Sequence, residues 1–357
     1  MKLRVVAVVV LAAGLSIASC SSSHSGSGSG SSATLAASSP ECTANRAAGT
    51  VHFASPFGYD ASPGIMDVYA ALQLGYFSDL CLNVDFINVP FTESPYALVS
   101  AGTAQITGSG SAADVLATQS GGANIVGVAT YAEASDYALL TRPDVTDLTQ
   151  LQGKLLAYHT SFPVVLTEML VKAGVDVSKV RTTNDTSYNP ELLIQDKFDA
   201  LQAYQSNEPL QLQAKGDKFT MWTPDKFGID GTFNVMVANR DFVSNHRQAV
   251  ADFLRAEFHA FTYCNANVAT CVGFLAKAQG STTQTPFAEQ EWKVESALVL
   301  AHHLPSAGVG VETIGEWAPE AAAVVEFKRV TGSPDLTTAE DTTIAASLYH
   351  GTTLIWP

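Results

Sequence analysis

Short apolar segments alternate with amphipathic segments along most of the chain. In the segment 65–77, the side chains of Ile65, Tyr69, Leu72 and Tyr76 recur at helical spacing and so share one face. Elements are predicted in turn at residues 51–54 (strand), 65–77 (helix), 84–89 (strand), 94–101 (helix), 104–108 (strand), 111–119 (helix) and 124–130 (strand). This alternation is typical of an α/β fold with largely parallel sheets.

A second set of such units occupies the middle of the chain, between two apolar strands at residues 137–142 and 232–238. Its predicted elements are strands at 155–158, 180–183 and 199–204 and helices at 163–173 and 190–195. From about residue 245 the pattern is mostly helical. We therefore expect two lobes joined by the two apolar strands, which would act as a hinge. The expected limits are residues 49–138 with 235–357 for lobe 1 and residues 139–234 for lobe 2.

The first residues have the pattern of a secretory signal. Lys2 and Arg4 precede an apolar run, residues 5–15, that is shorter than the ~20 residues needed to span a bilayer. The run leads to Ile17-Ala18-Ser19-Cys20, which resembles the lipobox of bacterial lipoproteins. This resemblance implies a signal peptide at residues 1–19, a lipid on Cys20 and anchoring to the extracytoplasmic face of the cell membrane. The alternative is an ordinary signal peptide with an incidental cysteine. Residues 20–48, which begin with a Ser/Gly-rich stretch, are predicted to be a tether.

Composition and cysteine usage narrow the function further. The 357 residues are 46% hydrophobic, which excludes a disordered chain, and a formal net charge of −15 without a basic run disfavours binding to nucleic acid. Besides Cys20, four cysteines remain, and an even number in an exported protein favours disulfides. Of the three pairings we favour Cys42–Cys81 and Cys264–Cys271. Closely spaced cysteine pairs with neighbouring histidines are missing from the sequence, so we expect no metal site and no cofactor.

The candidate ligand-binding residues of lobe 1 follow predicted strands, because ligands of open α/β sheets bind beyond the carboxyl ends of the strands. Phe57 and Tyr59 can stack on a planar ring or merely pack in a surface turn. Ser109 and Ser111 can offer hydroxyl and N–H groups to a ligand oxygen at a helix N-terminus, or Ser111 can simply cap that helix. The G-x-G-x-x-A pattern there is not interpreted as a dinucleotide motif, because it lies outside the first strand–helix unit. The candidates are Ser55, Phe57, Tyr59, Asp60, Ser109, Ser111 and Tyr131, the last of which is expected to close the cleft wall.

The candidates of lobe 2 follow two of its strands. His159 lies before a helix N-terminus and can donate or accept a hydrogen bond, although a lone histidine is more often structural. Asn207 both donates and accepts, and Glu208 accepts from an amino or ring N–H, which suits the edge of an aminopyrimidine or a flavin. The competing role of Asn207 is to cap the next helix. The candidates are Tyr158, His159, Ser161, Tyr204, Asn207 and Glu208.

Several stretches together resemble one family of binding proteins. Three of them read Leu74-Gly75-Tyr76-Phe77, Leu98-Val99-Ser100-Ala101-Gly102-Thr103-Ala104 and Leu151-Gln152-Gly153-Lys154. Two others read Ala203-Tyr204-Gln205-Ser206-Asn207-Glu208-Pro209 and Phe227-Gly228-Ile229-Asp230-Gly231-Thr232-Phe233, the latter followed by Asn239-Arg240-Asp241-Phe242-Val243. They resemble solute-binding proteins of ABC importers, in the superfamily for nitrate, sulfonates and taurine, thiamine pyrimidine precursors and riboflavin. The resemblance implies a two-lobed periplasmic-binding-protein-like fold of type II with a helical C-terminal part, an ABC permease as membrane partner, and a monomer.

The expected function is capture of a small molecule by hinge closure, without chemistry. The resemblance to the pyrimidine-precursor and riboflavin branch implies a planar nitrogen heterocycle. A sulfonate or nitrate-type anion is the alternative and would require a basic residue, which the candidate loops lack; a ligand-sensing receptor domain is another. An enzyme is not expected. A related fungal enzyme that shares the fold uses a Cys-rich, iron-binding run that this sequence lacks, and no Ser/His/Asp, HExxH or P-loop pattern occurs in it.

Overall fold

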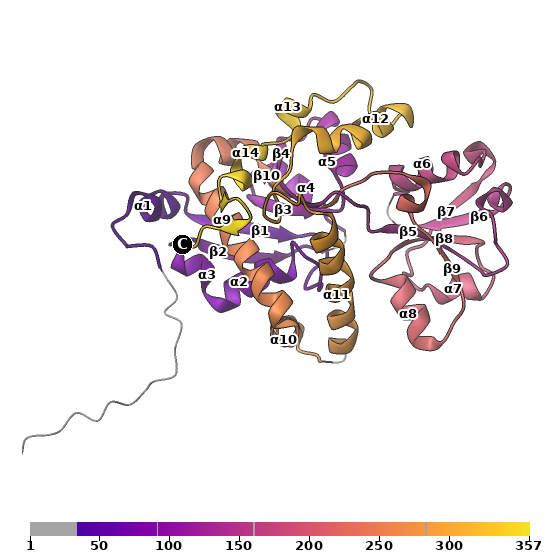
Figure 1. The fold of residues 1–357 in the computed structure, drawn as a ribbon, viewed down its shortest axis with the longest axis horizontal. Coiled ribbons are helices and arrows are strands. Elements are labelled where there is room, and N and C mark those ends of the chain that lie inside the picture. Colours follow the sequence, from indigo (N-terminus) through magenta and orange to yellow (C-terminus); the bar gives the residue numbers. More distant parts are fainter. Residues whose placement is uncertain (1–33, 91, 160, 283) are drawn as a thin grey trace, which may run out of the picture. The chain divides into compact units, whose positions relative to one another are not determined.

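A computed structural model describes residues 34–90, 92–159, 161–282 and 284–357 (Figure 1). The predicted signal peptide, Cys20 and the first part of the predicted tether lie outside the described residues. The last part of that predicted tether is a helix, α1 (Pro40–Ala47). Ser39 caps it by accepting a hydrogen bond from the N–H of Cys42, and Asn45 donates to the carbonyl of Leu80 at 2.7 Å. The polypeptide before the first strand is therefore partly folded onto the rest of the protein.

The first sheet has five strands in the order β2-β1-β3-β10-β4. Their bounds are β1 (Thr50–Ser55), β2 (Asn83–Asn88), β3 (Ile106–Ser109), β4 (Ile125–Ala132) and β10 (Phe233–Asn239). β1 runs parallel to β2 and β3, whereas β10 runs antiparallel to β3 and β4. Every residue of β4 is buried, as expected for a strand covered on both faces. The α/β architecture expected from the sequence is confirmed.

Helices pack on the first sheet and supply two apolar clusters. One cluster joins β1, β3 and β4 to α2, α9 and α10, and the other joins β10 and α4 to α5 and α12 around Trp317. The helices are α2 (Met66–Leu74), α3 (Tyr76–Asp79), α4 (Pro95–Ser100), α5 (Ala112–Ser120), α9 (Arg240–Ala266), α10 (Val268–Gln279), α11 (Thr285–His302), α12 (Ala318–Glu326), α13 (Leu336–Ala339) and α14 (Thr342–Ala346), with a 3-10 turn η4 (Ile314–Trp317). A short hairpin, β11 (Tyr349–His350) and β12 (Thr353–Leu354), follows them. The predicted helical C-terminal part therefore returns to the first sheet.

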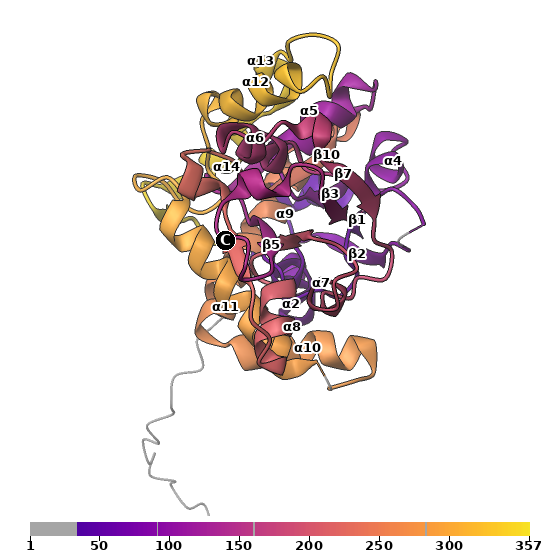
Figure 2. The same cartoon turned by 90° about the vertical axis from the view of Figure 1, so that its right-hand side faces the viewer.

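The second sheet has five strands in the order β7-β6-β8-β5-β9 (Figure 1). Figure 2 shows the protein from the side of this sheet, with β5 and β7 labelled. Its strands are β5 (Tyr137–Thr141), β6 (Leu155–Tyr158), β7 (Arg181–Asn184), β8 (Ala200–Tyr204) and β9 (Thr220–Trp222). Its helices are α6 (Val164–Lys172), α7 (Glu191–Ile194) and α8 (Glu208–Lys215), with 3-10 turns η1 (Leu148–Leu151), η2 (Val177–Lys179) and η3 (Pro224–Phe227). β6 runs parallel to β7 and β8, and β5 runs antiparallel to β8 and β9.

The two predicted hinge strands are present as β5 and β10. Each pairs with strands of one sheet: β5 with β8 and β9, and β10 with β3 and β4. The chain therefore passes between the sheets in the residues before them, 133–136 and 223–232. The limits of the two lobes given above stay a prediction.

One predicted helix is two helices in the structure. Gly75 has a φ of +83°, in the left-handed region that glycine adopts readily, and it ends α2 and precedes α3. The side chain of Tyr76 still packs against the apolar cluster beyond the break. Residues 65–77 therefore keep a helical hydrophobic spacing although the helix is interrupted.

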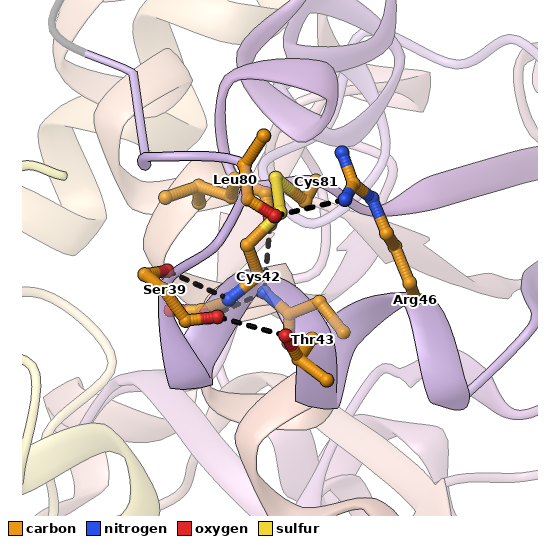
Figure 3. Close-up of a disulfide and its surroundings, with 9 residues drawn as sticks. Ser39, Cys42, Thr43, Arg46, Leu80 and Cys81 are labelled. Carbon is orange, nitrogen blue, oxygen red and sulfur yellow. Dashed lines mark hydrogen bonds between the residues drawn. A yellow bond between two sulfur atoms is a disulfide. The ribbon is translucent and has the colours of Figure 1, made fainter.

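Both disulfides have the predicted pairing. Cys42–Cys81 joins α1 to the turn after α3 (Figure 3), and Cys264–Cys271 joins the end of α9 to α10. Cys42, Cys264 and Cys271 are fully buried. None of the described helices combines the length and the apolar character needed to span a bilayer.

Candidate functional site

The loop after β1 carries two aromatic candidates that lie in different surroundings. Ser55, at the end of the strand, donates its hydroxyl to the carbonyl of Gly58 at 2.6 Å and so shapes the loop. The side chain of Phe57 is 45% exposed, and its ring meets the ring of Tyr204, from the second sheet, edge-on at 6.3 Å. Tyr59 instead packs its ring against Phe86 and the core of the first lobe. Of the two rings, only Phe57 bridges the sheets.

The loop after β3 is held by its own hydrogen bonds. Ser109 accepts from the hydroxyl of Tyr96 at 2.5 Å and donates to the carbonyl of Ser111 at 3.0 Å. Ser111 is the N-cap of α5 and accepts from the N–H of Asp114 at 3.3 Å. The capping interpretation of Ser111 is therefore confirmed.

A carboxyl group of the chain occupies the N-terminus of α5, where the sequence prediction placed a ligand oxygen. The N–H of Ala113 donates to Glu320 at 3.4 Å, and the N–H of Ala112 donates to the hydroxyl of Thr232 at 2.7 Å. Thr232 in turn donates to Glu320 at 2.5 Å, and Glu320 is only 3% exposed. Burial raises the pKa of Glu320 to about 7. An anion at this helix end would have to displace Glu320, because the donors are already used.

Asp114 and two tyrosines meet between the two sheets. Tyr137 and Tyr204 face each other in the register of β5 and β8, and their rings stack at 5.0 Å. The hydroxyl of Tyr137 lies beside the carboxyl of Asp114, which accepts from the hydroxyl of Ser111 at 3.0 Å. A Cβ on Gly110 would lie 3.2 Å from the hydroxyl of Tyr137, so the absence of a side chain there permits the close approach.

Burial raises the pKa of several groups in this junction. The pKa of Asp114 is raised by burial, although the hydrogen bond from Ser111 opposes the shift. Burial, followed by interactions with Tyr204 and Asp114, raises the pKa of Tyr137 well above its ordinary value. Burial and the charge of Asp114 do the same for Tyr96. The tyrosines therefore remain neutral hydrogen-bonding groups.

His159 is held inside the second lobe by partners of the chain. Its Nε2 lies 3.2 Å from a carboxylate oxygen of Glu208, and its Nδ1 lies 3.0 Å from the carbonyl oxygen of Asp185. The ring stacks on Tyr188 at 4.4 Å and is 6% exposed. Burial alone would lower the pKa of His159, because it favours the neutral ring. The hydrogen bonds and charges of Glu208 and Asp185 together outweigh burial, so the pKa of His159 is raised. Glu208 also accepts from the N–H of Tyr204 at 2.9 Å. His159 and Glu208 therefore both have a structural role.

Tyr131 lies in the core, not at a cleft wall. Its side chain is fully buried, and its hydroxyl lies 2.6 Å from Asp67 and 2.7 Å from Glu257. The reason is that β4 is buried along its whole length, so the residue at its end points into the packed helices. Burial raises the pKa of Asp67 to about 7 and that of Glu257 well above its ordinary value. The expectation that Tyr131 closes the cleft is not met.

The remaining candidates of lobe 2 lie at its surface or in its turns. Asn207 occupies the N-cap position of α8 without a capping bond from its side chain, and it accepts from Gln211 at 2.6 Å. Tyr158 is half-buried and meets Phe162 edge-on at 6.3 Å. Ser161 is exposed. The predicted capping bond of Asn207 is therefore absent, and its amide binds within α8 instead.

A cavity of about 320 Å³ has none of the tyrosines of this junction, Tyr96, Tyr137 and Tyr204, among its lining residues. Its lining includes Tyr59 and Asp60 from the loop after β1, Glu291 from α11 and Gln211 from α8. The volume is near the lower end of the ~300–1,000 Å³ that small-molecule sites occupy. Burial raises the pKa of Asp60 to about 6, and burial together with the charge of Asp60 raises that of Glu291 well above its ordinary value. Six of the predicted residues thus lie in two places. Tyr59 and Asp60 line this cavity, and Phe57, Ser109, Ser111 and Tyr204 lie at the tyrosine junction.

Comparison with known proteins identifies the family. The family described as NMT1/THI5 like matches residues 62–268, more than half of the chain. The chain belongs to the NMT1/THI5-like family. The matched part contains the whole second sheet, most of the first and the residues of the tyrosine junction that follow β3. No curated protein matches the chain by sequence.

Solved structures show that this NMT1/THI5-like chain is similar in fold to periplasmic binding proteins. The aliphatic sulphonate binding protein SsuA from Escherichia coli is 15% identical, with a TM-score of 0.61 over 89% of this chain and 94% of that chain. A ligand binding component of an ABC-type import system from Staphylococcus aureus, solved with zinc bound, is 11% identical, with a TM-score of 0.62 over 83% and 97%. The desulfurization enzyme DSZB is 11% identical, with a TM-score of 0.57 over 84% and 98%. The two-lobed fold expected from the sequence is confirmed.

Sequence reasoning missed three residues of the NMT1/THI5-like junction: Tyr96, Asp114 and Tyr137. Asp114 follows the N-cap Ser111 by three residues, a position that is typical of helix capping and gives no sign of a ligand role. Tyr137 begins a predicted hinge strand, so it was assigned to the connection. The part of the chain that the structure describes holds no group of three metal-binding side chains.

Proposed function

We propose that this protein is the solute-binding component of an ABC importer and captures a small organic molecule outside the cytoplasmic membrane. The family, the fold, and the names of the structures from E. coli and S. aureus support this. In the proposal the lipid on Cys20 anchors the protein and an ABC permease receives the ligand. The anchor, the permease and a monomeric state rest on the sequence resemblance alone.

The observation that carries the proposal is the meeting of side chains from two sheets at the ends of their strands. Phe57 contacts Tyr204, and the hydroxyl of Tyr137 lies beside the carboxyl of Asp114, so each pair joins the first lobe to the second. Among the described residues, two short chain segments, 133–136 and 223–232, pass between the sheets. Such an arrangement can open by hinge motion, and a ligand that contacts both lobes would favour the closed form.

The chemistry of the junction supports a planar nitrogen heterocycle, such as a thiamine pyrimidine precursor or a flavin. Phe57 and Tyr204 offer aromatic surface, and Asp114 and Tyr96 offer hydrogen-bond acceptors. Stacking on aromatic side chains, combined with a few polar groups, is the usual basis for binding such ligands.

A sulfonate or a similar small anion is the second candidate, and the comparisons with solved structures favour it over the heterocycle. The name of the E. coli protein says that it binds aliphatic sulphonates. In this chain an anion at the N-terminus of α5 would meet the buried carboxyl of Glu320 and the nearby carboxyl of Asp114. The two ligand classes therefore make opposite demands on the same carboxyl groups.

The proposed role is binding without turnover. Two other roles compete with it: that of an enzyme and that of a ligand-sensing receptor domain. The similarity to DSZB shows that the fold also occurs in an enzyme. A receptor domain that passes closure to a signalling partner would use the same hinge. Turnover of a bound compound by the purified protein would support an enzyme. A permease gene beside this one would support an importer over a sensor.

Mass spectrometry of small molecules released from the denatured protein tests the proposal. Thermal unfolding with thiamine pyrimidine precursors, riboflavin and taurine then identifies the class, because a ligand at 100 times its Kd stabilises the folded state by about 2.7 kcal/mol. A stabilising heterocycle supports the first candidate, and stabilisation by taurine alone supports the second. Failure of every compound to bind, with no small molecule released, contradicts the proposal.

A further inference from the structure

Asp114 places a carboxyl group at the junction of the two lobes. It lies in the first turn of α5 and accepts from the hydroxyl of Ser111 in its own lobe, and the hydroxyl of Tyr137 from the other lobe lies beside it. Hydroxyl partners are neutral, so they leave the negative charge of an ionised Asp114 uncompensated. Burial makes that charge unfavourable in the ligand-free protein, as the raised pKa of Asp114 indicates.

Three tyrosines lie around this carboxyl group, and a phenylalanine packs on one of them. Tyr137 stacks on Tyr204, and Phe57 meets Tyr204 edge-on. Tyr96 lies close enough to Asp114 and Tyr204 to interact electrostatically with both. Aromatic rings attract cations through their negative faces, most strongly where water is excluded. A carboxyl group among such rings is the usual composition of a site for a positively charged nitrogen.

Basic side chains do not neutralise the site. Within the described ranges, none of the ion pairs formed by Lys or Arg involves Asp114 or Glu320. Arg329 lowers the pKa of Asp114 from a distance, but it is exposed and donates to the carbonyl of Phe162. Asp114 and Glu320 also raise each other's cost of ionisation. A ligand cation would relieve this repulsion, whereas a ligand anion would add to it.

We propose that Asp114, walled by Tyr96, Tyr137 and Tyr204, receives a positively charged nitrogen group of the ligand, such as an amidinium or a protonated ring amine. This inference rests on the solute-binding function proposed above. The ligand enters when the lobes part and Tyr137 moves away from Asp114. Its N–H groups then bond the carboxylate, and charge-assisted bonds of this kind are about twice as strong as neutral ones.

Three probes with the same ring and different charge test the inference: benzamidine (positive), benzamide (neutral) and benzenesulfonate (negative). Their affinities for the full wild-type protein are measured by isothermal titration calorimetry. We expect benzamidine to bind at least about tenfold more tightly than benzamide, and benzenesulfonate to bind more weakly than benzamide. This ranking needs no variant, so it holds even if a substituted protein fails to fold.

Variants then assign the preference to Asp114. Asp114→Asn keeps the shape and should reduce the preference for benzamidine over benzamide to less than about threefold. Glu326→Gln removes an equal charge from an exposed residue of α12 and should change nothing.

The outcomes separate this inference from the proposed function. Tighter binding of benzenesulfonate than of benzamidine, or an unchanged preference in Asp114→Asn, overturns the role of Asp114 while solute binding stands. Failure of benzamidine to bind at millimolar concentration also overturns it. If, in addition, the purified protein releases no small molecule on denaturation, the proposed function fails as well.

Discussion

Ser206 joins the two lobes through a buried carboxyl group, and its removal should open the protein. It follows β8 of the second sheet and donates its hydroxyl at 2.6 Å to Glu295 of α11, which packs on the first sheet. Asp136, in the first connecting segment, lies 3.1 Å from the same hydroxyl. Burial, together with the charge of Glu208, raises the pKa of Asp136 to about 8, so near neutral pH Asp136 can donate its proton to Ser206. Burial raises the pKa of Glu295 well above its ordinary value as well, so the bond from Ser206 joins neutral groups. Removing one partner and leaving the other buried and unsatisfied costs about 1–3 kcal/mol.

Ser206→Ala should therefore lower the ratio of closed to open protein by about 5-fold to 150-fold, at about 1.4 kcal/mol per factor of ten. Small-angle X-ray scattering of the ligand-free protein should show a larger radius of gyration than the wild type. Ser62→Ala is the matched control, because Ser62 donates to the other oxygen of Glu295 at 2.5 Å from within the first lobe. It should lower the unfolding free energy by a similar amount without changing the radius. Equal radii for Ser206→Ala and the wild type would refute the reasoning.

Three further predictions concern stability. Burial raises the pKa of Asp136 from 3.8 to about 8 and that of Glu320 from 4.5 to about 7, so between these values the folded chain holds protons that the unfolded chain has released. The unfolding free energy in urea should consequently fall from pH 5 to pH 8, and a rise would contradict this. Tyr131→Phe leaves Asp67 and Glu257 without their shared hydroxyl. It should lower the unfolding free energy, measured in urea at pH 7, by about 2–4 kcal/mol. Tyr188→Phe, at an exposed side chain, should lower it by less than about 1 kcal/mol. Replacing both Cys42 and Cys81, which are 39 residues apart, by Ser should lower the unfolding free energy by about 4 kcal/mol through loop entropy. The same change at Cys264 and Cys271, which are 7 residues apart, should lower it by about 2 kcal/mol. Equal losses for the two pairs would count against the entropic account.

Local patterns were sufficient to predict most elements and both disulfides. Residues 155–158 form β6 as predicted, because a short apolar run between turn residues has few alternatives. Hydrophobic spacing did not show the break at Gly75, since the side chains beyond it continue to face the same core. β9, only three residues long, gave no strand pattern.

The site was harder to predict because its contacts join distant parts of the chain. The carboxyl group of Glu320 reaches the N-terminus of α5 across 207 residues, and no local pattern at Ser111 could indicate that partner. Tyr131 illustrates the reverse error: its place at a strand end suggested a cleft, but helices from the C-terminal part cover it. Phe57 and Tyr204 were found because each directly follows or ends a strand at the edge where the two sheets meet.

The pH dependence of binding would separate the two ligand classes, because both Glu320 and Asp114 gain charge as the pH rises. Burial raises the pKa of Glu320 to about 7 and raises that of Asp114, so each carboxyl is more often neutral at pH 5.5 than at pH 8. Benzenesulfonate and benzamidine keep their charges over this range. A cation should therefore bind more tightly at pH 8 and an anion more tightly at pH 5.5. With Glu320 half ionised at about pH 7, we expect the Kd of benzamidine to fall at least about threefold between the two pH values. Affinities that do not change with pH would mean that neither carboxyl faces the ligand, and the site would then have to be sought at the cavity beside Asp60 and Glu291.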